Sequence, residues 1–332
     1  MLKAGFVAIT GKHTNMTIIS NEEFMRQRVS KLDLVVNDLN TGGLKNPELV
    51  EQFFQLSIKE AKTLPLFTVK TMASHTLDIP KGRFEQQILN PGVEATALLA
   101  AQRSKPAFSK TTLEAKEYRG QVTISDEFFE DNVEEEDMRN TIEAMMREKV
   151  GLELEELAWN GDTASANPFL ATLDGFLVQA VSNINNAAGS TTNKGVFKNV
   201  LKQMPSQYMR DRSRMIHFTS IDSKLDFEDS IGNRATQLGD QQFSPNLGRI
   251  YISGSEVVDV PVLPEDLGVG NNETQMIFCD PKNMALGIYR NRTFKSQADI
   301  VAGVIHLVVT LRIDYKYINE EAVIKTTSLV VG

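Results

Sequence analysis

The part of the chain that most constrains the fold runs from Ile79 to Asn160, where a long polar ribbon is followed directly by one long helix. Residues 111–125 (TTLEAKEYRGQVTIS) alternate like one long strand, but neither face of their first half is apolar enough for a core strand. Only Val122 and Ile124 are expected to be buried. Because an isolated two-stranded hairpin is marginal in water, this hairpin should be anchored at its base and lie on another surface. The pattern favours a subunit of an assembly.

The helix that follows is predicted to run from near Val133 to near Trp159. Acidic residues crowd its first turn (134–137), where negative charge complements the helix dipole. A helix of roughly 27 residues would span about 40 Å. Its apolar stripe is expected to consist of Met138, Ile142, Met145, Met146, Val150, Leu154 and Leu157.

Upstream of the hairpin the sequence predicts two helices, at residues 21–39 and 47–62, and then a strand at 66–74. In the first helix, apolar residues recur at alternating spacings of four and three, but this seam is shorter than coiled coils require. The helix therefore either packs on its own domain or docks on a neighbouring chain or an accessory protein. The residues of the seam are the candidates for docking: Met25, Val29, Leu32 and Val36.

Downstream of the long helix, short strands and helices alternate. For the whole chain, with its helices, hairpin and C-terminal strands, we expect the α+β class. The strongest strand pattern lies at 305–317, and residues 322–331 are expected to pair with it as a hairpin across Asn319-Glu320. Further strands are expected at 215–219, 251–263, 276–280 and 284–289, and further helices at 194–208 and 221–230.

The composition and net charge of the chain argue against several classes of protein. The chain has 332 residues and a net charge of −8, without the basic balance that is typical of nucleic-acid-binding domains. Its length suggests about two domains. The single cysteine, Cys279, provides no intrachain disulfide and is expected to be a small buried hydrophobe. No apolar run approaches the length of a membrane span.

The sequence also lacks a readable active site. The glycine-rich segment GFVAITGKH at the N-terminus has the wrong spacing for a phosphate-binding loop, and the four histidines have no metal-ligand spacing. There is no G-x-S-x-G motif. The acidic run at 126–137 is interpreted as a solvated helix start. We therefore expect no enzyme activity, cofactor or metal.

The hairpin carries charges of both signs, which suit salt bridges between subunits better than phosphate binding. The candidates for intersubunit contact are Lys81, Arg83, Glu85, Lys105, Lys110, Glu114, Lys116, Glu117 and Arg119.

The order of these elements resembles the major capsid protein of tailed bacteriophages, which has the Hong Kong 97 fold. The resemblance covers nearly the whole chain. The segments that carry it are 121–132 (QVTISDEFFEDN), 157–177 (LAWNGDTASANPFLATLDGFL), 276–291 (MIFCDPKNMALGIYRN), where Cys279 replaces a glycine, and 310–327, with Arg312-x-Asp314.

The resemblance implies a domain organisation. The expected divisions are an N-terminal helical arm (1–62), a strand of the peripheral or P-domain (63–78), an extended hairpin called the E-loop (79–121), the P-domain with its spine helix (122–165), the axial or A-domain (166–300) and C-terminal P-domain strands (301–332).

It also implies a function. Copies of the chain would form hexamers and pentamers of an icosahedral shell around double-stranded DNA, which the acidic chain would contact weakly and non-specifically. The protein would be part of the virion, assembled in the bacterial cytoplasm, with scaffolding, portal and decoration proteins as further partners and without a membrane. With only about 60 residues before the first P-domain strand, we expect no cleaved N-terminal scaffolding segment. The alternatives are an encapsulin-type nanocompartment shell and a soluble two-domain enzyme.

Overall fold

A computed structural model describes residues 56–59, 61–84, 87–92, 97, 99, 103–125, 135–232, 249–290 and 293–332, with side chains of the long helix described from 141 onward. The chain divides into two compact units. Unit 1 comprises Met1–Gln52, Arg119–Met138 and Thr293–Thr310, and unit 2 comprises Phe53–Tyr118, Arg139–Arg292 and Leu311–Gly332.

Unit 2 contains a six-stranded mixed sheet. Its strands follow the spatial order β5 (Ile184–Thr191), β13 (Ile324–Val330), β9 (Glu273–Cys279), β6 (Ile216–Thr219), β8 (Ser255–Asp259) and β7 (Ile250–Ile252). β13 is parallel to β5 and β6 is parallel to β8, whereas β9 runs antiparallel to both β13 and β6. Strands β5 and β7 are therefore the two edges of this sheet.

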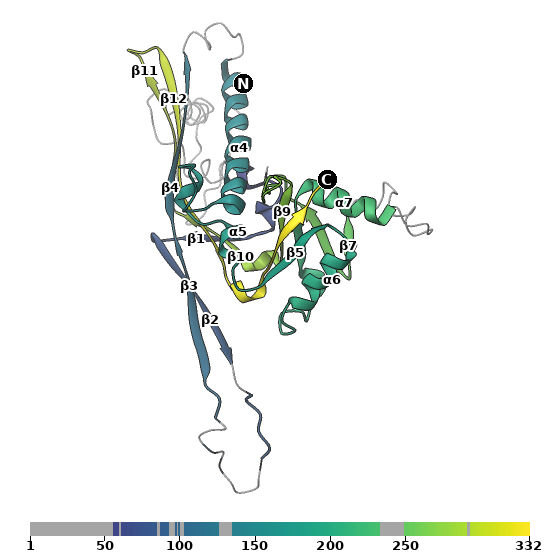
Figure 1. Cartoon of the computed structure of the whole chain (residues 1–332). Coiled ribbons are helices and arrows are strands. Elements are labelled where there is room, and N and C mark those ends of the chain that lie inside the picture. Colours follow the sequence, from purple (N-terminus) through teal and green to yellow (C-terminus); the bar gives the residue numbers. More distant parts are fainter. Residues whose placement is uncertain are drawn as a thin grey trace, which may run out of the picture. The chain divides into compact units, whose positions relative to one another are not determined.

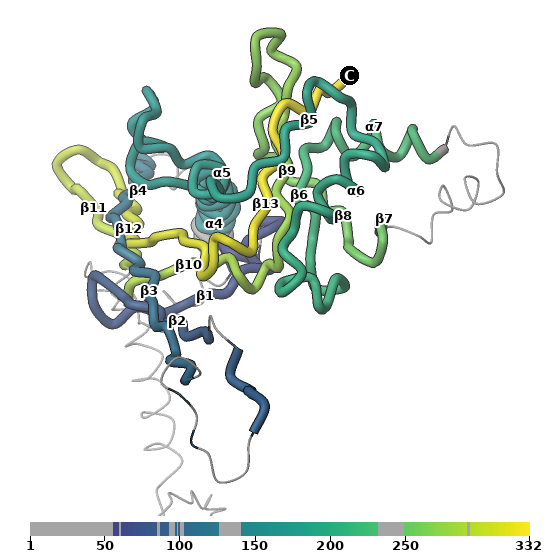
Figure 2. Tube along the Cα trace, turned by 60° about the horizontal axis from the view of Figure 1, so that its bottom comes forward, coloured from purple at the N-terminus to yellow at the C-terminus, as the bar shows by residue number. Residues whose placement is uncertain are grey.

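Helices α6 (Lys194–Gln203) and α7 (Ile221–Gly232) cover one face of that sheet (Figures 1 and 2). Asn193 caps α6, because its side-chain oxygen accepts hydrogen bonds from the backbone N–H groups of Gly195 and Val196. Phe197 of α6 and Phe227 of α7 meet with ring centroids 4.8 Å apart. The two helices thus share one apolar core with the sheet beneath them.

His217 of β6 lies in this core and is fully buried. Its ring stacks on Phe278 with centroids 4.2 Å apart and meets the edge of Phe197. Burial lowers the pKa of His217 to about 3, so the imidazole is neutral at physiological pH. Cys279, at the end of β9, is also fully buried, which confirms the sequence-based expectation.

The opposite face of the sheet packs on α4 (Glu135–Asn160) and on the short helix α5 (Phe176–Gln179). Phe218 of β6 lies 5.1 Å from the Trp159 ring, and Phe176 in turn lies 6.0 Å from Trp159. The hydroxyl of Tyr315 donates to the carbonyl of Leu154, which ties the helix to the C-terminal strands. None of the described helices, α4 included, is both long and apolar enough to cross a membrane.

A second sheet contains β1 (Thr68–Met72), β10 (Met284–Tyr289) and β12 (Val304–Tyr317). In unit 2, β1 pairs in parallel with β10, and β10 pairs antiparallel with the second part of β12. In unit 1, β11 (Thr293–Asp299) pairs antiparallel with the first part of β12. Strand β4 (Lys116–Ser125) also pairs with β12.

Short 3₁₀ turns connect several of these elements. They are Leu64–Leu66, Leu170–Thr172, Arg212–Arg214, Pro281–Asn283 and Glu320–Ala322.

The predicted hairpin between the last two strands is wrong. Ile324–Val330 does not pair with β12 but lies between β9 and β5 in the other sheet. The 3₁₀ turn at Glu320–Ala322 separates the two strands. The two strands are therefore adjacent in sequence but belong to different sheets.

Two further expectations need correction. The single strand predicted at 111–125 is interrupted at Ala115, and both Leu113 and Ala115 are fully buried, whereas Val122 and Ile124 are only partly buried. On α4, Met145 is 64% exposed although it was assigned to the apolar stripe, because the neighbouring Met146 occupies the buried position. The α+β class and strand β10 are confirmed as predicted.

Candidate intersubunit contact surface

Strands β2 (Thr76–Phe84) and β3 (Pro106–Glu114) form a two-stranded antiparallel ribbon in unit 2. Their register runs through nine pairs, from Thr76 opposite Glu114 to Phe84 opposite Pro106. Within the described residues these strands pair only with each other, and Figure 1 shows the ribbon extending away from β1 and β10. The ribbon therefore has a base beside the second sheet and a tip beyond it.

The base is packed against apolar side chains. Leu113 and Ala115 are fully buried and form a cluster with Met72 of β1. Gly287 of β10 lies beneath them, and a Cβ at this position would come within 2.8 Å of the Met72 sulfur and 3.1 Å of Leu113 Cδ1. The strand can pack this closely because residue 287 has no side chain.

The base is also held by a buried carboxylate. Asp314 of β12 accepts hydrogen bonds from the backbone N–H groups of Glu114, at 2.7 Å, and of Tyr315, at 2.9 Å. Burial raises the pKa of Asp314 and outweighs these hydrogen bonds, which favour the charged form. Nearby, the hydroxyl of Thr111 donates to the carbonyl of Ile318 at 3.1 Å.

Arg312, two residues earlier, binds the start of β4. Its Nε donates to Glu117 Oε2 at 2.8 Å, its Nη2 donates to the same oxygen, and its guanidinium lies 5.6 Å from the centre of the Tyr289 ring. The Arg312-x-Asp314 pair, which the sequence offered only as part of a resemblance, thus fixes the chain on both sides of Ala115.

Several charged side chains along the ribbon pair within the chain. Lys110 forms an ion pair with Asp78 at 2.6 Å, and Thr112 donates to the same carboxylate at 2.6 Å. The hydrogen bond from Lys110 lowers the pKa of Asp78. Arg83 Nη1 lies 2.7 Å from Glu321 Oε2, and this contact lowers the pKa of Glu321. These pairs are largely exposed.

The other sequence-predicted contact residues are placed as follows. Lys81 is partly exposed, and its charge also lowers the pKa of Glu321. Lys105, Lys116 and Arg119 are exposed, as is the side chain of Glu114. Five candidates lie outside the described residues: Glu85 and the docking seam Met25, Val29, Leu32 and Val36.

The tip of the ribbon carries exposed apolar side chains that the sequence analysis missed. Leu89 is 81% exposed and Phe108 is 80% exposed, although the Phe108 ring lies along Gly82. Large exposed apolar side chains that cluster are typical of interaction surfaces. We define the tip cluster as Phe84, Ile88, Leu89, Leu99 and Phe108. The available signal was one aromatic residue near the tip end of each strand, Phe84 in β2 and Phe108 in β3, which the analysis of charges did not use.

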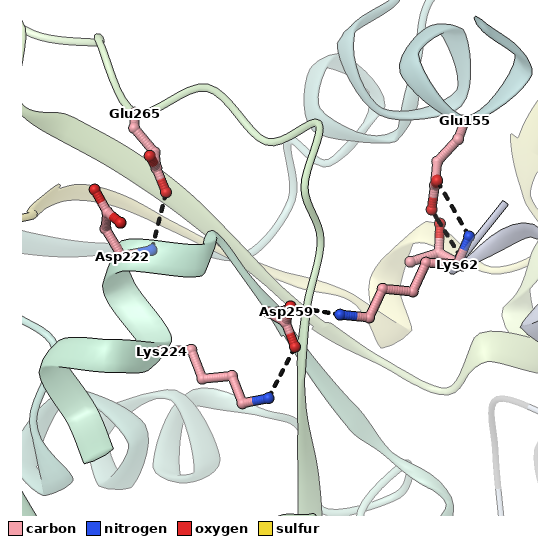
Figure 3. Close-up of polar contacts among 7 residues, drawn as sticks. Lys62, Glu155, Asp222, Lys224, Asp259 and Glu265 are labelled. Carbon is pink, nitrogen blue, oxygen red and sulfur yellow. Dashed lines mark hydrogen bonds and ion pairs between the residues drawn. The ribbon is translucent and has the colours of Figure 1, made fainter. Parts of the chain in front are cut away.

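A polar network that is buried only around Thr63 and Glu155, also not predicted, supports the body of unit 2 (Figure 3). Glu155 of α4 accepts a hydrogen bond from the backbone N–H of Thr63 at 2.7 Å, and Trp159 Nε1 donates to the Thr63 hydroxyl at 3.0 Å. Asp259 of β8 accepts from Lys224 at 2.8 Å and from Lys62. Burial alone would raise the pKa of Asp259, but these hydrogen bonds hold it at about 2. The network is structural in character, and the described residues contain no cluster suited to a metal.

Solved structures of proteins that form shells have a similar fold. The chain aligns with the "Satellite phage P4 procapsid including size determination (Sid) protein" with a TM-score of 0.57 and 12% identity, over 85% of this chain and 99% of that one. It also aligns with the "holo-SrpI encapsulin complex from Synechococcus elongatus PCC 7942", with a TM-score of 0.51 and 9% identity, over 80% of this chain and 86% of that one. The chain has the Hong Kong 97 fold of these shell proteins.

Sequence comparison is more specific. The model of the phage capsid family matches residues 41–328. The curated "Putative prophage capsid protein YqbE" of Bacillus subtilis (strain 168) is 31% identical over 301 residues, which is 90% of this chain and 96% of that protein. The chain belongs to the phage capsid family. It is a structural protein of the virion, a major capsid protein whose copies form an icosahedral shell.

Proposed function

We propose that the β2–β3 ribbon is the arm by which each copy grips a neighbouring copy in hexamers and pentamers of the shell. The observation that carries this proposal is the tip cluster. Two of its five apolar side chains lie on the strands and three in the connection between them, and each of the five is more than half exposed. Among the described residues, these two strands pair only with each other.

The contrast between base and tip supports an arm rather than a loose loop. The base is held by Leu113, Ala115 and Asp314, so its position is fixed by its own chain. Covering a large apolar side chain contributes about 1.5–3 kcal/mol when it leaves water completely. A neighbouring subunit that covers the tip cluster would therefore supply a substantial driving force for assembly.

Charges along the arm would set its register on the neighbour. Lys105 and Lys116 are exposed, and Lys81, Arg83, Lys110, Glu114, Glu117 and Arg119 are retained as contact candidates. Charge complementarity contributes more to specificity and register than to affinity, so these residues would select the docking position while the tip cluster supplies the attraction. Glu85 remains a candidate on the same reasoning.

The finer organisation is also proposed. Residues 79–121 are assigned as the E-loop, 63–78, 122–165 and 301–332 as the P-domain, 166–300 as the A-domain, and 1–62 as a helical arm that docks through Met25, Val29, Leu32 and Val36. The shell encloses double-stranded DNA that it contacts weakly, and it assembles in the bacterial cytoplasm with scaffolding, portal and decoration proteins. The protein carries out no catalysis and requires no cofactor.

The experiment is removal of the tip. Residues 85–105 are replaced by Asn-Gly, which leaves all nine strand pairs in place and offers a two-residue turn. We expect an unchanged melting temperature of the dissociated chain and complete loss of shells in electron microscopy and sedimentation.

A matched control makes this result interpretable. A chain with residues 85–105 replaced by a Gly/Ser segment of equal length separates the chemistry of the tip from its length. If the tip deletion unfolds the dissociated chain, or if shells form without the tip, the arm proposal is wrong.

Double-stranded DNA inside particles made in bacteria would distinguish a phage head from a nanocompartment shell.

A further inference from the structure

The six-stranded sheet presents two different surfaces near its opposite edges. Helix α6 lies against β5, the first strand of the order, and α7 lies against β8, next to the last. Both helices belong to unit 2 and cover the same face of the sheet (Figure 2). Each helix has a buried side towards the sheet and an exposed side, and the two exposed sides differ in charge.

The exposed side of α6 is basic. Lys194, Lys198 and Lys202 follow one another at intervals of four and form a single stripe, because residues four apart lie on one face of a helix. This stripe points away from the buried Phe197 and Val200.

The end of α6 is joined to the edge strand, since Gln203 donates to the carbonyl of Ile184 at 2.8 Å. Ile184 is 47% exposed and the adjacent Val181 is 63% exposed. We call this surface the lysine edge: Val181, Ile184, Lys194, Lys198 and Lys202. Glu320 is the acidic group beside it, and its carboxylate already accepts the backbone N–H groups of Val181 and Ser182.

The exposed side of α7 has the opposite character. Ile221 and Leu225 are exposed at a spacing of four, and the exposed Asp222 and Asp229 flank them. Glu265, which accepts the backbone N–H of Asp222 at 3.0 Å, adds a further carboxylate (Figure 3). Lys224 does not offset this charge, because it is paired with Asp259. We call Ile221, Asp222, Leu225 and Asp229 the α7 face.

We propose that the lysine edge of one copy docks on the α7 face of the next copy around a ring. Each surface combines two exposed aliphatic side chains with charges of one sign, and the signs are opposite. Because the two surfaces are different and lie near opposite edges of one sheet, the contact is heterologous, and a heterologous contact generates a ring when its rotation closes. This inference rests on the proposed function, since it supplies a ring contact separate from the β2–β3 arm.

Charge exchange tests the contact. K198E/K202E reverses the lysine edge and D222K/D229K reverses the α7 face, so each variant places like charges opposite one another. We expect each variant to lose at least tenfold in yield of rings or shells, with the melting temperature of the dissociated chain within a few degrees of the parent. The chain that carries all four substitutions restores opposite charges and should regain assembly, and K198R/K202R should assemble like the parent.

Cysteine crosslinking tests the same contact without shells. A chain with I184C and a chain with L225C are mixed at high concentration and treated with a short bis-maleimide; the native Cys279 is fully buried and does not interfere. We expect a covalent dimer in the mixture and none with either variant alone. Crosslinking of one variant to itself would mean that like surfaces meet, and it would overturn the proposal.

The outcomes separate the two proposals. If the chain without residues 85–105 still forms shells and the mixed cysteine variants crosslink, the ring contact stands and the arm proposal fails. If the charge-reversed variants form shells at the parental yield, the ring contact is wrong. Parental yield with less packaged DNA would assign the lysine edge to nucleic acid instead, which also overturns the proposal.

Discussion

The base and the tip of the β2–β3 ribbon differ sharply, although the same two strands form both. At the base, Leu113 is fully buried and a buried Asp314 accepts the backbone N–H of Glu114. At the tip, Phe108 is 80% exposed. The difference teaches that strand pairing alone does not determine what a ribbon does. The base belongs to the fold of its own chain, whereas the tip has the surface chemistry of a contact with another molecule. Substitutions along the ribbon should therefore show a gradient in monomer stability.

The largest loss of stability is expected for Leu113→Ala. This change empties a fully buried site next to Met72 and Gly287, and such truncations cost about 2–5 kcal/mol. Chemical denaturation of the dissociated chain measures it. Leu89→Ala, at the exposed tip, is the matched control, and equal losses for the two leucines would remove the distinction between base and tip.

The next largest effect is expected for Asp314→Ala. It leaves two backbone N–H groups without their acceptor, which costs about 1–3 kcal/mol for each group that stays buried. Asp314→Asn keeps one acceptor oxygen and should lose less.

The same carboxyl gives the base a characteristic pH dependence. Because the folded-state pKa of Asp314 is raised above its ordinary 3.8, the native chain binds this proton more readily than the unfolded chain does. Its contribution to stability therefore increases as pH falls through the raised pKa towards 3.8, and Asp314→Asn should abolish that slope. An unchanged slope in the Asn variant would show that Asp314 does not titrate as inferred.

A smaller effect is expected for Arg83→Ala, in the last pair but one of the ribbon. Its ion pair with Glu321 is about half exposed on both sides, and such pairs contribute no more than about 1 kcal/mol. The pKa of Glu321 is lowered, so the contribution is present above 4.5 and is lost as pH falls through the folded-state pKa, opposite in sign to Asp314. Added salt should reduce the difference between Arg83→Ala and the parent; a salt-independent loss would argue for packing instead.

The smallest effect on stability is expected at the tip. Phe108→Ser should change the unfolding free energy by no more than about 0.5 kcal/mol, because the ring is exposed. The yield of shells should nevertheless fall, since the change removes part of the tip cluster. Thermal melts of the dissociated chain and particle counts measure the two quantities. If Phe108→Ser strongly destabilised the dissociated chain but left the yield of shells normal, Phe108 would belong to the fold of its own chain and not to a contact with another copy.

Much of the fold could be predicted from local patterns. Periodicity located β10, the long helix and the alternation of helices and strands, because these signals lie within each segment. The partner of β13 could not be found this way. Adjacent strands usually pair, and the choice of β9 and β5 depends on contacts distant in sequence.

The contact surface was predicted only in part. The sequence pointed to the hairpin and to its charges, but several of these charges pair within the chain, such as Lys110 with Asp78. Leu113 looked too isolated to be a core residue, because its partners Met72 and Gly287 come from other strands. The tip cluster was missed because its members are scattered among polar residues, and their exposure is known only once the ribbon has formed. Burial and exposure at this surface are properties of the tertiary structure.

The absence of a side chain at Gly287 has a geometric consequence. The nine paired residues of the ribbon extend about 30 Å from this point, so a tilt of about 10° at the base would move the far end by about 5 Å. The ribbon thus pivots at its contact with Gly287. A single methyl group added there would displace the far end of the ribbon much further than it displaces the base. The precision with which one copy can reach another is therefore determined where the ribbon leaves its own chain.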